Sequence, residues 1–414
     1  MPHTIWFVPT NSSHVDKLKA MMDELAARGH QVRLLCPDAV QQSLVASRES
    51  VERAGYPYEV LPAGGFPGES HWSWMIFHLA KLDRVVRGFL DSHPADALVF
   101  GEDVGAGSRA FIRAARPRGI ATVMVPDGLV LPPNPDYHVS LWWRLRDALS
   151  LFLRRTLRVG GPRGTGGADL ILTMTETGRQ AFVERGVAAE RIRVVGSCEY
   201  DALVRRVEPR LTADEARELR ARLGLLPDRP VILFSHQHVV APPEMRPVMQ
   251  KIAAATRRCG AALLVKFHPR STDDPEEWRQ WAQGEGFGEE DVVFVRNECT
   301  SIEAVRLCTV CVTFFSTTAL EALVWRKPLV LIQCVNTWYV LEYGSQCGAA
   351  LEAKKLEDLE PAIISAATDP EVQERLRRGA EAALQKELFG LDGQSSRRMA
   401  DSVIDLIERR RGKG

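Results

Sequence analysis

The sequence predicts an α/β protein with two domains, each built around a parallel β-sheet that helices cover. Three observations support this prediction. The chain has 414 residues, which is more than a single hydrophobic core usually serves. Short apolar runs alternate with segments whose apolar residues recur at helical spacing, as in βαβ units. The alternation pauses between residues 196 and 230 and restarts at Val231, which marks a second domain.

The first half begins with a βαβ unit. A strand is expected at residues 4–8 and a helix at 15–28, which Gly29 ends as a C-cap residue. The further strands expected here are residues 31–36, 58–61, 97–100, 121–125, 170–174 and 192–195, and the further helices are 76–92 and 108–116. Each strand is short, apolar and followed by a polar loop, as expected for buried parallel strands. The stretch 160–167 (GGPRGTGG) is expected to be a flexible loop.

The second half repeats the alternation after a mostly helical crossing over residues 199–222. Its expected strands are residues 231–234, 262–267, 292–295, 310–313 and 329–333, and a charged helical tail follows over 355–411. We therefore expect an N-terminal Rossmann-like domain at 1–205 and a C-terminal Rossmann-like domain at 206–390. Residues 391–414 are expected to form a helix that packs back on the N-terminal domain.

Composition indicates an ordinary cytoplasmic protein. Basic and acidic residues number 53 each, so nothing in the net charge points to nucleic acid. The eight cysteines include one C-x-x-C, Cys308 and Cys311, inside an apolar stretch, which favours buried thiols over zinc or redox chemistry. The apolar run at residues 5–8 is too short for a signal peptide. No run of about 18 apolar residues is present to span a membrane.

Residues 141–159 (LWWRLRDALSLFLRRTLRV) depart from this ordinary pattern, because five arginines interleave with tryptophan, phenylalanine and leucine. A basic helix with an aromatic, apolar face can lie in a membrane interface or hold a partner helix. It can also pack on its own domain with solvated arginines. The sequence leaves open whether this segment makes a peripheral contact with the inner face of a membrane.

Polar residues follow the strands of the second domain at their carboxyl ends. Ligands of open parallel α/β sheets bind outside that edge, so three polar loops there predict one site. Imidazole, cationic and hydroxyl groups suit a ligand that carries phosphate. The residues expected to bind it are His236, Gln237, Lys266, His268, Pro269, Arg270, Ser316, Thr317, Thr318 and Glu321.

Two of these expectations have alternatives. Glu321 could complete a capping box with Thr318 instead of accepting ribose hydroxyls. His236 and His238 form an H-x-H pair, which can indicate metal, but no convergent cluster of carboxylates or histidines follows at ligand spacing. A phosphate-binding loop fits this pair better, and we expect neither metal nor cofactor.

Three residues of the first domain are candidates for a general base. Asp127 precedes a glycine directly after an expected strand, where a carboxylate can approach a substrate closely. Glu102 holds the equivalent place after the preceding strand. His14 lies in the first turn of the first helix, and an imidazole titrates near neutrality. Each of the three could instead be a polar residue of a turn or helix start.

These residues together resemble glycosyltransferases of the GT-B architecture, in which two Rossmann-like domains face a cleft. The motifs Asp127-Gly128, His268-Pro269 and Ser316-Thr317 are similar to those of bacterial capsule- and polysialic-acid-type transferases. The resemblance covers most of the chain through short motifs. Pro126 departs from it, because that family more usually has a second acidic residue there.

The resemblance implies a metal-independent glycosyltransferase of polysaccharide biosynthesis. In that family the aspartate of the Asp-Gly motif is the base, and the histidine of the His-Pro motif touches the donor phosphate. Carried over, Asp127 deprotonates an acceptor hydroxyl, while His268 and the hydroxyls of residues 316–318 stabilise the leaving nucleotide. The donor is expected to be a CMP- or UDP-linked sugar. The acceptor could be a saccharide, a lipid-linked glycan or a small molecule.

Two alternatives share the same architecture. One is a nucleotide-sugar 2-epimerase, which would need acidic and basic partners positioned on one sugar. The other is a non-catalytic nucleotide-sugar-binding protein. With His14 as base, the chain would look instead like the UDP- or dTDP-sugar transferases.

Overall fold

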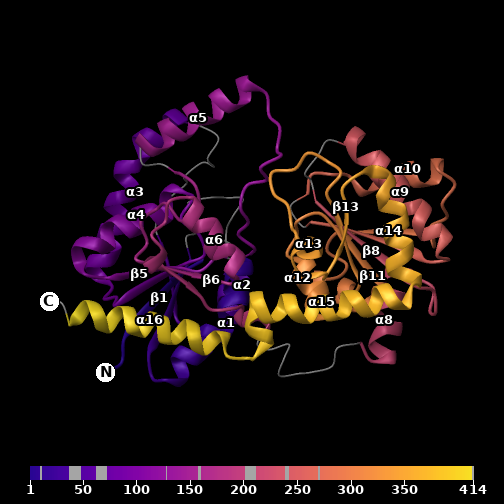
Figure 1. Ribbon diagram of the computed structural model, residues 1–414. Coiled ribbons are helices and arrows are strands. Elements are labelled where there is room, and N and C mark those ends of the chain that lie inside the picture. The colour runs from indigo at the N-terminus through magenta and orange to yellow at the C-terminus, as the bar shows by residue number, and fades with distance from the viewer. Residues whose placement is uncertain are drawn as a thin grey trace. The chain divides into compact units, whose positions relative to one another are not determined.

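The computed structural model describes residues 1–9, 12–36, 48–61, 72–126, 128–156, 160–200, 211–237, 242–268 and 271–412. The chain forms two compact units (Figure 1). Unit 1 comprises Met1–Pro132, Val139–Arg206 and Leu391–Gly414, and unit 2 comprises Pro133–His138 and Val207–Gly390. Each unit contains one parallel β-sheet with helices, which confirms the predicted fold class of two Rossmann-like α/β domains.

The sheet of unit 1 has seven strands among the described residues, in the order β3-β2-β1-β4-β5-β6-β7, and every pairing is parallel. The strands are β1 (Thr4–Val8), β2 (Gln31–Cys36), β3 (Tyr58–Val60), β4 (Ala97–Phe100), β5 (Ala121–Met124), β6 (Leu170–Thr173) and β7 (Ile192–Val194). Strand β4 is central and lies between β1 and β5, so the carboxyl ends of these three parallel strands meet at one edge of the sheet.

Helices cover both faces of this sheet. The helices of unit 1 are α1 (Ser12–Ala27), α2 (Arg48–Ala54), α3 (Trp72–Ser92), α4 (Ala106–Ala115), α5 (Leu141–Thr156), α6 (Glu176–Glu184) and α16 (Ser395–Arg411), with 3-10 turns at Arg116–Arg118 and Ala189–Arg191. Side chains from α3, α4 and α6 bury Trp6 and Phe100 on one face. Side chains from α1, α2 and α16 bury Ile5 and Phe7 on the other. This alternation along β1 is the pattern of a strand buried on both sides.

Helix α16 belongs to the fold of unit 1, although it ends the chain. Its Met399, Val403 and Ile407 are buried in the same cluster as β1 and α1. The carboxylate of Asp401 accepts a hydrogen bond from Arg28 at 2.5 Å. This helix therefore closes one face of the first sheet.

The sheet of unit 2 has six strands among the described residues, in the order β10-β9-β8-β11-β12-β13, all parallel. The strands are β8 (Val231–His236), β9 (Ala262–Phe267), β10 (Val292–Val295), β11 (Val310–Thr313), β12 (Leu329–Ile332) and β13 (Leu351–Ala353). The strand order reverses direction at β8. Such a topological switch point is where open α/β sheets bind ligands.

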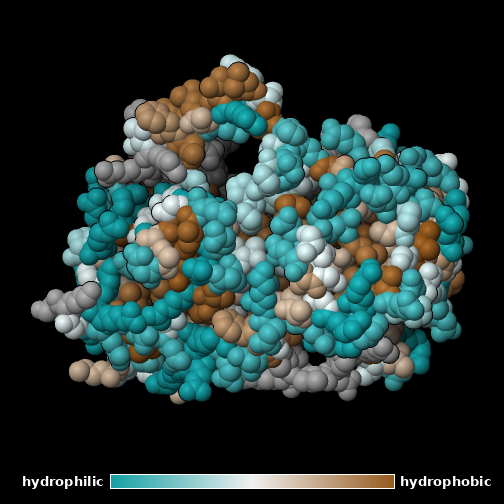
Figure 2. All heavy atoms as spheres, viewed as in Figure 1, coloured by the Kyte–Doolittle hydropathy of each residue, from teal (hydrophilic) through white to brown (hydrophobic). Residues whose placement is uncertain are grey.

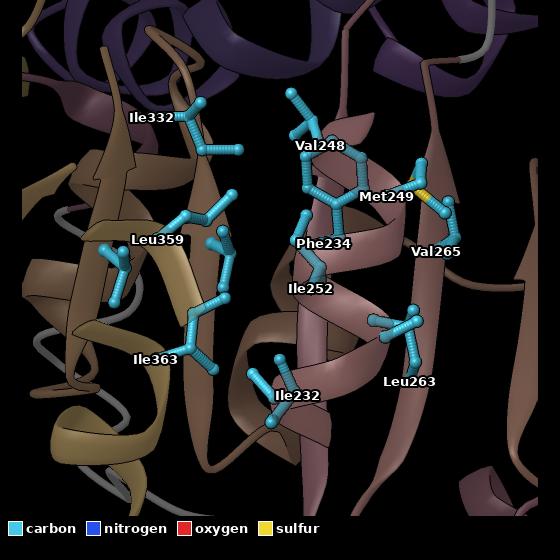
Figure 3. Packing of buried hydrophobic residues seen from close by; sticks show 14 of the residues in the cluster. Ile232, Phe234, Val248, Met249, Ile252, Leu263, Val265, Ile332, Leu359 and Ile363 are labelled. Atoms are coloured by element: carbon cyan, nitrogen blue, oxygen red, sulfur yellow. The ribbon is translucent and has the colours of Figure 1, made fainter. Parts of the chain in front are cut away.

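The helices of unit 2 are α8 (Ala213–Leu223), α9 (Pro242–Arg258), α10 (Pro275–Gly284), α11 (Ser301–Leu307), α12 (Thr318–Val324), α13 (Tyr343–Cys347), α14 (Leu356–Thr368) and α15 (Pro370–Leu388), and a 3-10 turn at Phe389–Leu391 follows. Figure 3 shows Phe234 of β8 and Val265 of β9 packed under Met249 of α9. Leu359 and Ile363 of α14 extend this core beside β12. Each such side chain contributes about 1.5–3 kcal/mol on full burial.

A short proline-rich segment, Pro133–His138, belongs to unit 2 rather than to the N-terminal domain in which the sequence placed it. The backbone N–H of Asn134 donates to the carbonyl of Trp338 at 2.8 Å, and the Asn134 amide donates to the carbonyl of Thr337 at 2.9 Å. Proline favours extended backbone and lacks an N–H donor, so this segment is suited to the edge of a loop.

The two cysteines of the C-x-x-C sequence are buried thiols, as expected. All eight cysteines lie in the described part of the chain and are free thiols. Cys308 and Cys311 are buried, and burial raises the pKa of the Cys308 thiol to about 12. Of the helices that the structure describes, none is both long and apolar enough to cross a membrane.

Candidate functional site

Three hydroxyl groups meet at the carboxyl edge of the second sheet. The Oγ of Ser235, at the end of β8, donates to the Oγ1 of Thr318 at 3.0 Å. Thr318 Oγ1 lies 3.0 Å from the Oγ of Ser316, and the backbone N–H of Thr318 donates to that same Ser316 oxygen at 3.2 Å. Ser235 and Thr318 are buried, whereas Ser316 is half-buried. We call Ser235, Ser316 and Thr318 the hydroxyl cluster.

Parallel pairing brings these residues together. Ser235 of β8 is in register with Thr313, the last residue of β11, and Thr313 Oγ1 donates to the Ser235 carbonyl at 3.1 Å. The next residues are linked as well, because the backbone N–H of Phe315 donates to Gln237 Oε1 at 3.0 Å. Gln237 therefore ties the loop after β8 to the loop after β11 and fixes the hydroxyl cluster between them.

Lys266 is in register with Ser235 of the cluster, so it lies on the same side of the sheet, and both Lys266 and Glu321 are buried. The ammonium of Lys266 donates to the carbonyls of Arg296 at 2.6 Å and Phe267 at 3.3 Å. Burial lowers the pKa of Lys266, and the charges of Cys299, Glu298 and Glu321 oppose that shift. Lys266 thus binds the backbone where β9 and β10 end.

Glu321 is buried in helix α12, and its Oε1 accepts a hydrogen bond from Ser301 Oγ of α11 at 3.1 Å. The N-cap residue of α12 is Thr317, whose side chain makes no capping hydrogen bond. This register is one residue too early for a capping box between Thr318 and Glu321. That alternative for Glu321 is therefore wrong.

His236 lies on the opposite face of the sheet. It is 2% exposed, and its ring makes edge-to-face contacts with Phe234, Phe267 and Trp278. Its Nδ1 is 3.8 Å from Asp273 Oδ2. Side chains alternate across a strand, so the ligand-facing position at the end of β8 belongs to Ser235 and not to His236. The structure thus separates His236 from the hydroxyl cluster.

The His-Pro motif is described only in part. His268 follows β9 directly, is exposed, and its carbonyl accepts the backbone N–H of Ser271 at 2.8 Å. Pro269 and Arg270 lie outside the described residues. A cavity of 540 Å³ beside the edge strand β10, lined in part by Arg222, Arg279 and Phe287, contains none of the predicted donor-binding residues.

In unit 1, the candidate base His14 packs against the end of β4. Its side chain is 1% exposed. A Cβ atom at Gly101 would lie 1.9 Å from His14 Cε1, so only glycine leaves room for this ring. Asp127, the third residue after β5, lies outside the described residues, while its neighbours Pro126 and Gly128 are described.

Glu102 and Asp103 organise the glycine-rich loop 160–167, which the sequence predicted to be flexible. The Asp103 carboxylate is fully buried and accepts the backbone N–H groups of Gly164 at 2.7 Å and Gly166 at 2.5 Å. Glu102 Oε2 lies 3.7 Å from the guanidinium of Arg163 in the same loop. The prediction of flexibility is wrong, because glycines here allow the backbone to wrap around a buried carboxylate.

Sequence analysis missed three residues of these arrangements. Ser235 was overlooked in favour of His236, although strand alternation could have distinguished them. Ser301 and Arg163 carry no signal in the sequence, because each meets its carboxylate partner only in the fold.

Comparison with solved structures identifies the architecture. A UDP-N-acetylglucosamine 2-epimerase from Neisseria meningitidis, bound to UDP-GlcNAc, is 11% identical with a TM-score of 0.64, covering 97% of this chain and 100% of that one. A glycosyltransferase from Rickettsia africae is 10% identical with a TM-score of 0.63, covering 98% and 99%. The fold is of the GT-B type.

Other comparisons agree with this GT-B fold. HepE of Anabaena, in complex with UDP, is 14% identical with a TM-score of 0.59, covering 97% of this chain and 100% of that chain. A family model described as a glycosyl transferase 4-like domain matches residues 17–198, which lie in unit 1 apart from the segment Pro133–His138. No curated protein matches the sequence. The GT-B proteins similar to this chain therefore include both glycosyltransferases and epimerases.

Proposed function

We propose that this protein is a glycosyltransferase that moves a sugar from a nucleotide-sugar donor to an acceptor hydroxyl without a metal ion. The observation that carries the proposal is the hydroxyl cluster at the switch point of the second sheet. The match of unit 1 to a glycosyl transferase 4-like domain supports transfer, and UDP in similar GT-B structures supports a nucleotide-sugar donor.

The cluster can present one O–H group to a phosphate. Ser235 donates to Thr318, so Thr318 can pass its own hydrogen on to Ser316. Ser316 then accepts from both the hydroxyl and the backbone N–H of Thr318, which leaves its own O–H to donate outward. A chain of hydrogen bonds polarises its last donor. We propose that Ser316 donates to the donor phosphate and that the exposed His268 supplies a second contact.

We propose Asp127 as the general base for the acceptor hydroxyl. Its position follows β5, as those of Glu102 and His14 follow the adjacent strands β4 and β1, so all three belong to one edge of the first sheet. Glu102 already lies beside Arg163, and His14 is almost inaccessible. We prefer Asp127 because the resemblance gives the role of base to the aspartate of an Asp-Gly motif.

Nucleotide binding and turnover test this proposal separately. UDP or CMP should raise the melting temperature of the full-length protein, because a ligand that binds only the folded state stabilises it. Ser316→Ala should raise the dissociation constant about tenfold or more, as expected for one lost hydrogen bond to a charged group. Ser345→Ala, at an exposed serine of α13, is the matched control. The proposed donor site would be contradicted if the melting temperature did not change with any of UDP, CMP, GDP, dTDP and CDP.

Transfer is measured as free nucleotide released when a membrane lipid extract or a set of aryl glycosides is added as acceptor. Asp127→Asn should lower this rate at least about 100-fold, the usual contribution of a general base. It should leave the nucleotide-induced shift in melting temperature unchanged. Equal turnover by wild type and Asp127→Asn would remove Asp127 from the proposed mechanism.

A 2-epimerase is the second candidate, because the Glu102–Arg163 pair provides acidic and basic partners at one place in unit 1. The GT-B structures similar to this chain also include epimerases. NMR of UDP-GlcNAc incubated with the protein alone distinguishes the two. A new sugar isomer without release of UDP would favour the epimerase, whereas release of UDP that depends on an acceptor would favour the transferase.

A further inference from the structure

Helix α5 presents its apolar face to solvent rather than to the domain that carries it. Among its exposed side chains, Trp142 is 73% and Phe152 is 64% exposed. The other large apolar residues of the helix that are exposed are Leu141, Trp143, Leu145, Leu149 and Leu153. Figure 1 shows α5 standing away from the sheet of unit 1, and Figure 2 shows the same helix as a hydrophobic stretch on the surface. The alternative in which this helix packs its apolar face on its own domain is therefore wrong.

The apolar residues form one sector of the helix. At about 100° per residue, Leu141, Trp142, Leu145, Leu149, Phe152 and Leu153 fall within about 120° of one another. Arg146 borders this sector and stacks on the ring of Trp143, with the guanidinium carbon 3.4 Å from the ring centroid. Arg144, Asp147 and Ser150 lie on the remaining circumference. The helix is thus amphipathic, and both its apolar sector and its polar residues Arg146 and Asp147 are exposed.

The positive charge of α5 indicates which kind of partner its apolar sector binds. Residues 141–159 contain five arginines and one aspartate, in a chain whose formal net charge is zero. Basic residues beside exposed tryptophans complement a surface that offers both anionic headgroups and acyl chains. The 16 residues of α5 extend about 24 Å, which is too short to cross a bilayer but suits a helix lying in its interface.

We propose that α5 docks unit 1 on an anionic membrane surface, with its apolar sector inserted among the lipid headgroups. The helix would lie parallel to the bilayer, and the arginines would contact anionic lipid. This inference does not depend on the transfer reaction, because it concerns only the surface of unit 1.

Sedimentation of the full-length protein with lipid vesicles tests the docking. Vesicles of phosphatidylcholine with about a third of phosphatidylglycerol should bind the protein, and pure phosphatidylcholine vesicles should bind it less. The double variant Leu149→Glu/Phe152→Glu should weaken partition at least tenfold, since each side chain loses apolar burial. The matched control is Leu226→Glu, at an apolar residue of unit 2 that is 49% exposed, and it should bind as wild type does.

The dependence of vesicle binding on charge provides a second test of the proposal. Arg144→Gln/Arg146→Gln should lower partition into anionic vesicles about fivefold for each charge removed and should leave binding to neutral vesicles unchanged. Raising the salt concentration should weaken wild-type binding in the same direction. The Leu149→Glu/Phe152→Glu and Arg144→Gln/Arg146→Gln variants replace only exposed side chains, so their melting temperatures should match that of the wild type.

Three results would overturn the proposal. The first is that the wild-type protein does not bind anionic vesicles. The second is that the Leu149→Glu/Phe152→Glu variant binds them as tightly as the wild type does. The third is self-association of the wild type in analytical ultracentrifugation that the double variant abolishes while neither protein binds vesicles. That outcome would assign the apolar sector to a second copy of the chain.

Discussion

The imidazole of His14 fills the space that a side chain at Gly101 would occupy. These two residues therefore allow the start of α1 to pack closely against the end of β4. We expect Gly101→Ala to lower the free energy of unfolding by about 1–3 kcal/mol, the usual cost of overpacking. Urea unfolding followed by circular dichroism measures this. Gly88→Ala in α3, where a Cβ would meet nothing within 4 Å, is the control and should be neutral or stabilising.

A compensating substitution makes this prediction specific. If the clash with the imidazole is the cause, His14→Ala should recover much of the loss when combined with Gly101→Ala. Additive effects of the two substitutions would refute the steric explanation, because residues in contact are expected to couple.

The hydroxyl cluster should behave as one energetic unit. Thr318→Val keeps the shape of the side chain but leaves the buried Ser235 hydroxyl without its acceptor, so we expect a loss of about 1–3 kcal/mol of stability. Ser235→Ala removes the donor, so adding it to Thr318→Val should cost little more. A double-mutant cycle in urea measures the coupling, and independent effects would show that the 3.0 Å contact does not link them energetically.

The Asp103 carboxylate should determine whether the loop 160–167 is ordered. Asp103→Asn replaces one acceptor oxygen by an NH₂ donor that faces a backbone N–H, which should lower stability by about 2–3 kcal/mol. Amide hydrogen exchange at Gly164 and Gly166 should accelerate in this variant. Glu102→Gln is the matched control, since a partly exposed ion pair at 3.7 Å contributes only about 0–1 kcal/mol. Unchanged exchange at both glycines would contradict the assigned role.

Lys266 should make stability depend on pH in the alkaline range. Burial lowers its pKa below the usual value near 10.5, so the unfolded chain binds the proton more tightly than the folded one does. Between the folded and unfolded pKa values, stability attributable to this residue should therefore rise with pH. Urea unfolding at several pH values between about 8 and 10.5 should show this rise in wild type relative to Lys266→Met. Parallel pH profiles for the two proteins would show that Lys266 is not the group responsible.

The sequence predicted the sheets well and the side-chain placement poorly, for physical reasons. Strands β2, β4, β9, β10 and β11 have the bounds expected from their apolar runs. The short elements α2 and β13 were missed, because seven mostly polar residues or three strand residues carry little periodicity. Such segments form only because tertiary packing stabilises them.

At the candidate site, too, the presence of the strands was predicted correctly and the side-chain directions were not. Polar residues at the strand ends were expected, but strand β8 continues through Ser235 and His236 and turns them to opposite faces. A one-residue difference in where a strand ends therefore reverses the assignment. The loop 160–167 was misjudged because glycine composition reports local freedom, while the buried Asp103 that organises it lies 61 positions from Gly164.

Helix α16 has a consequence for how the protein is made. Its Met399, Val403 and Ile407 complete a core that begins with Ile5, so one face of the first sheet lacks its cover until α16 is translated. Domains generally fold as units during synthesis, with the N-terminal one first. In this chain, residues 207–390 of unit 2 are synthesised before the helix that closes unit 1. The synthesis of unit 1 therefore starts first, yet we expect its core to be completed after that of unit 2.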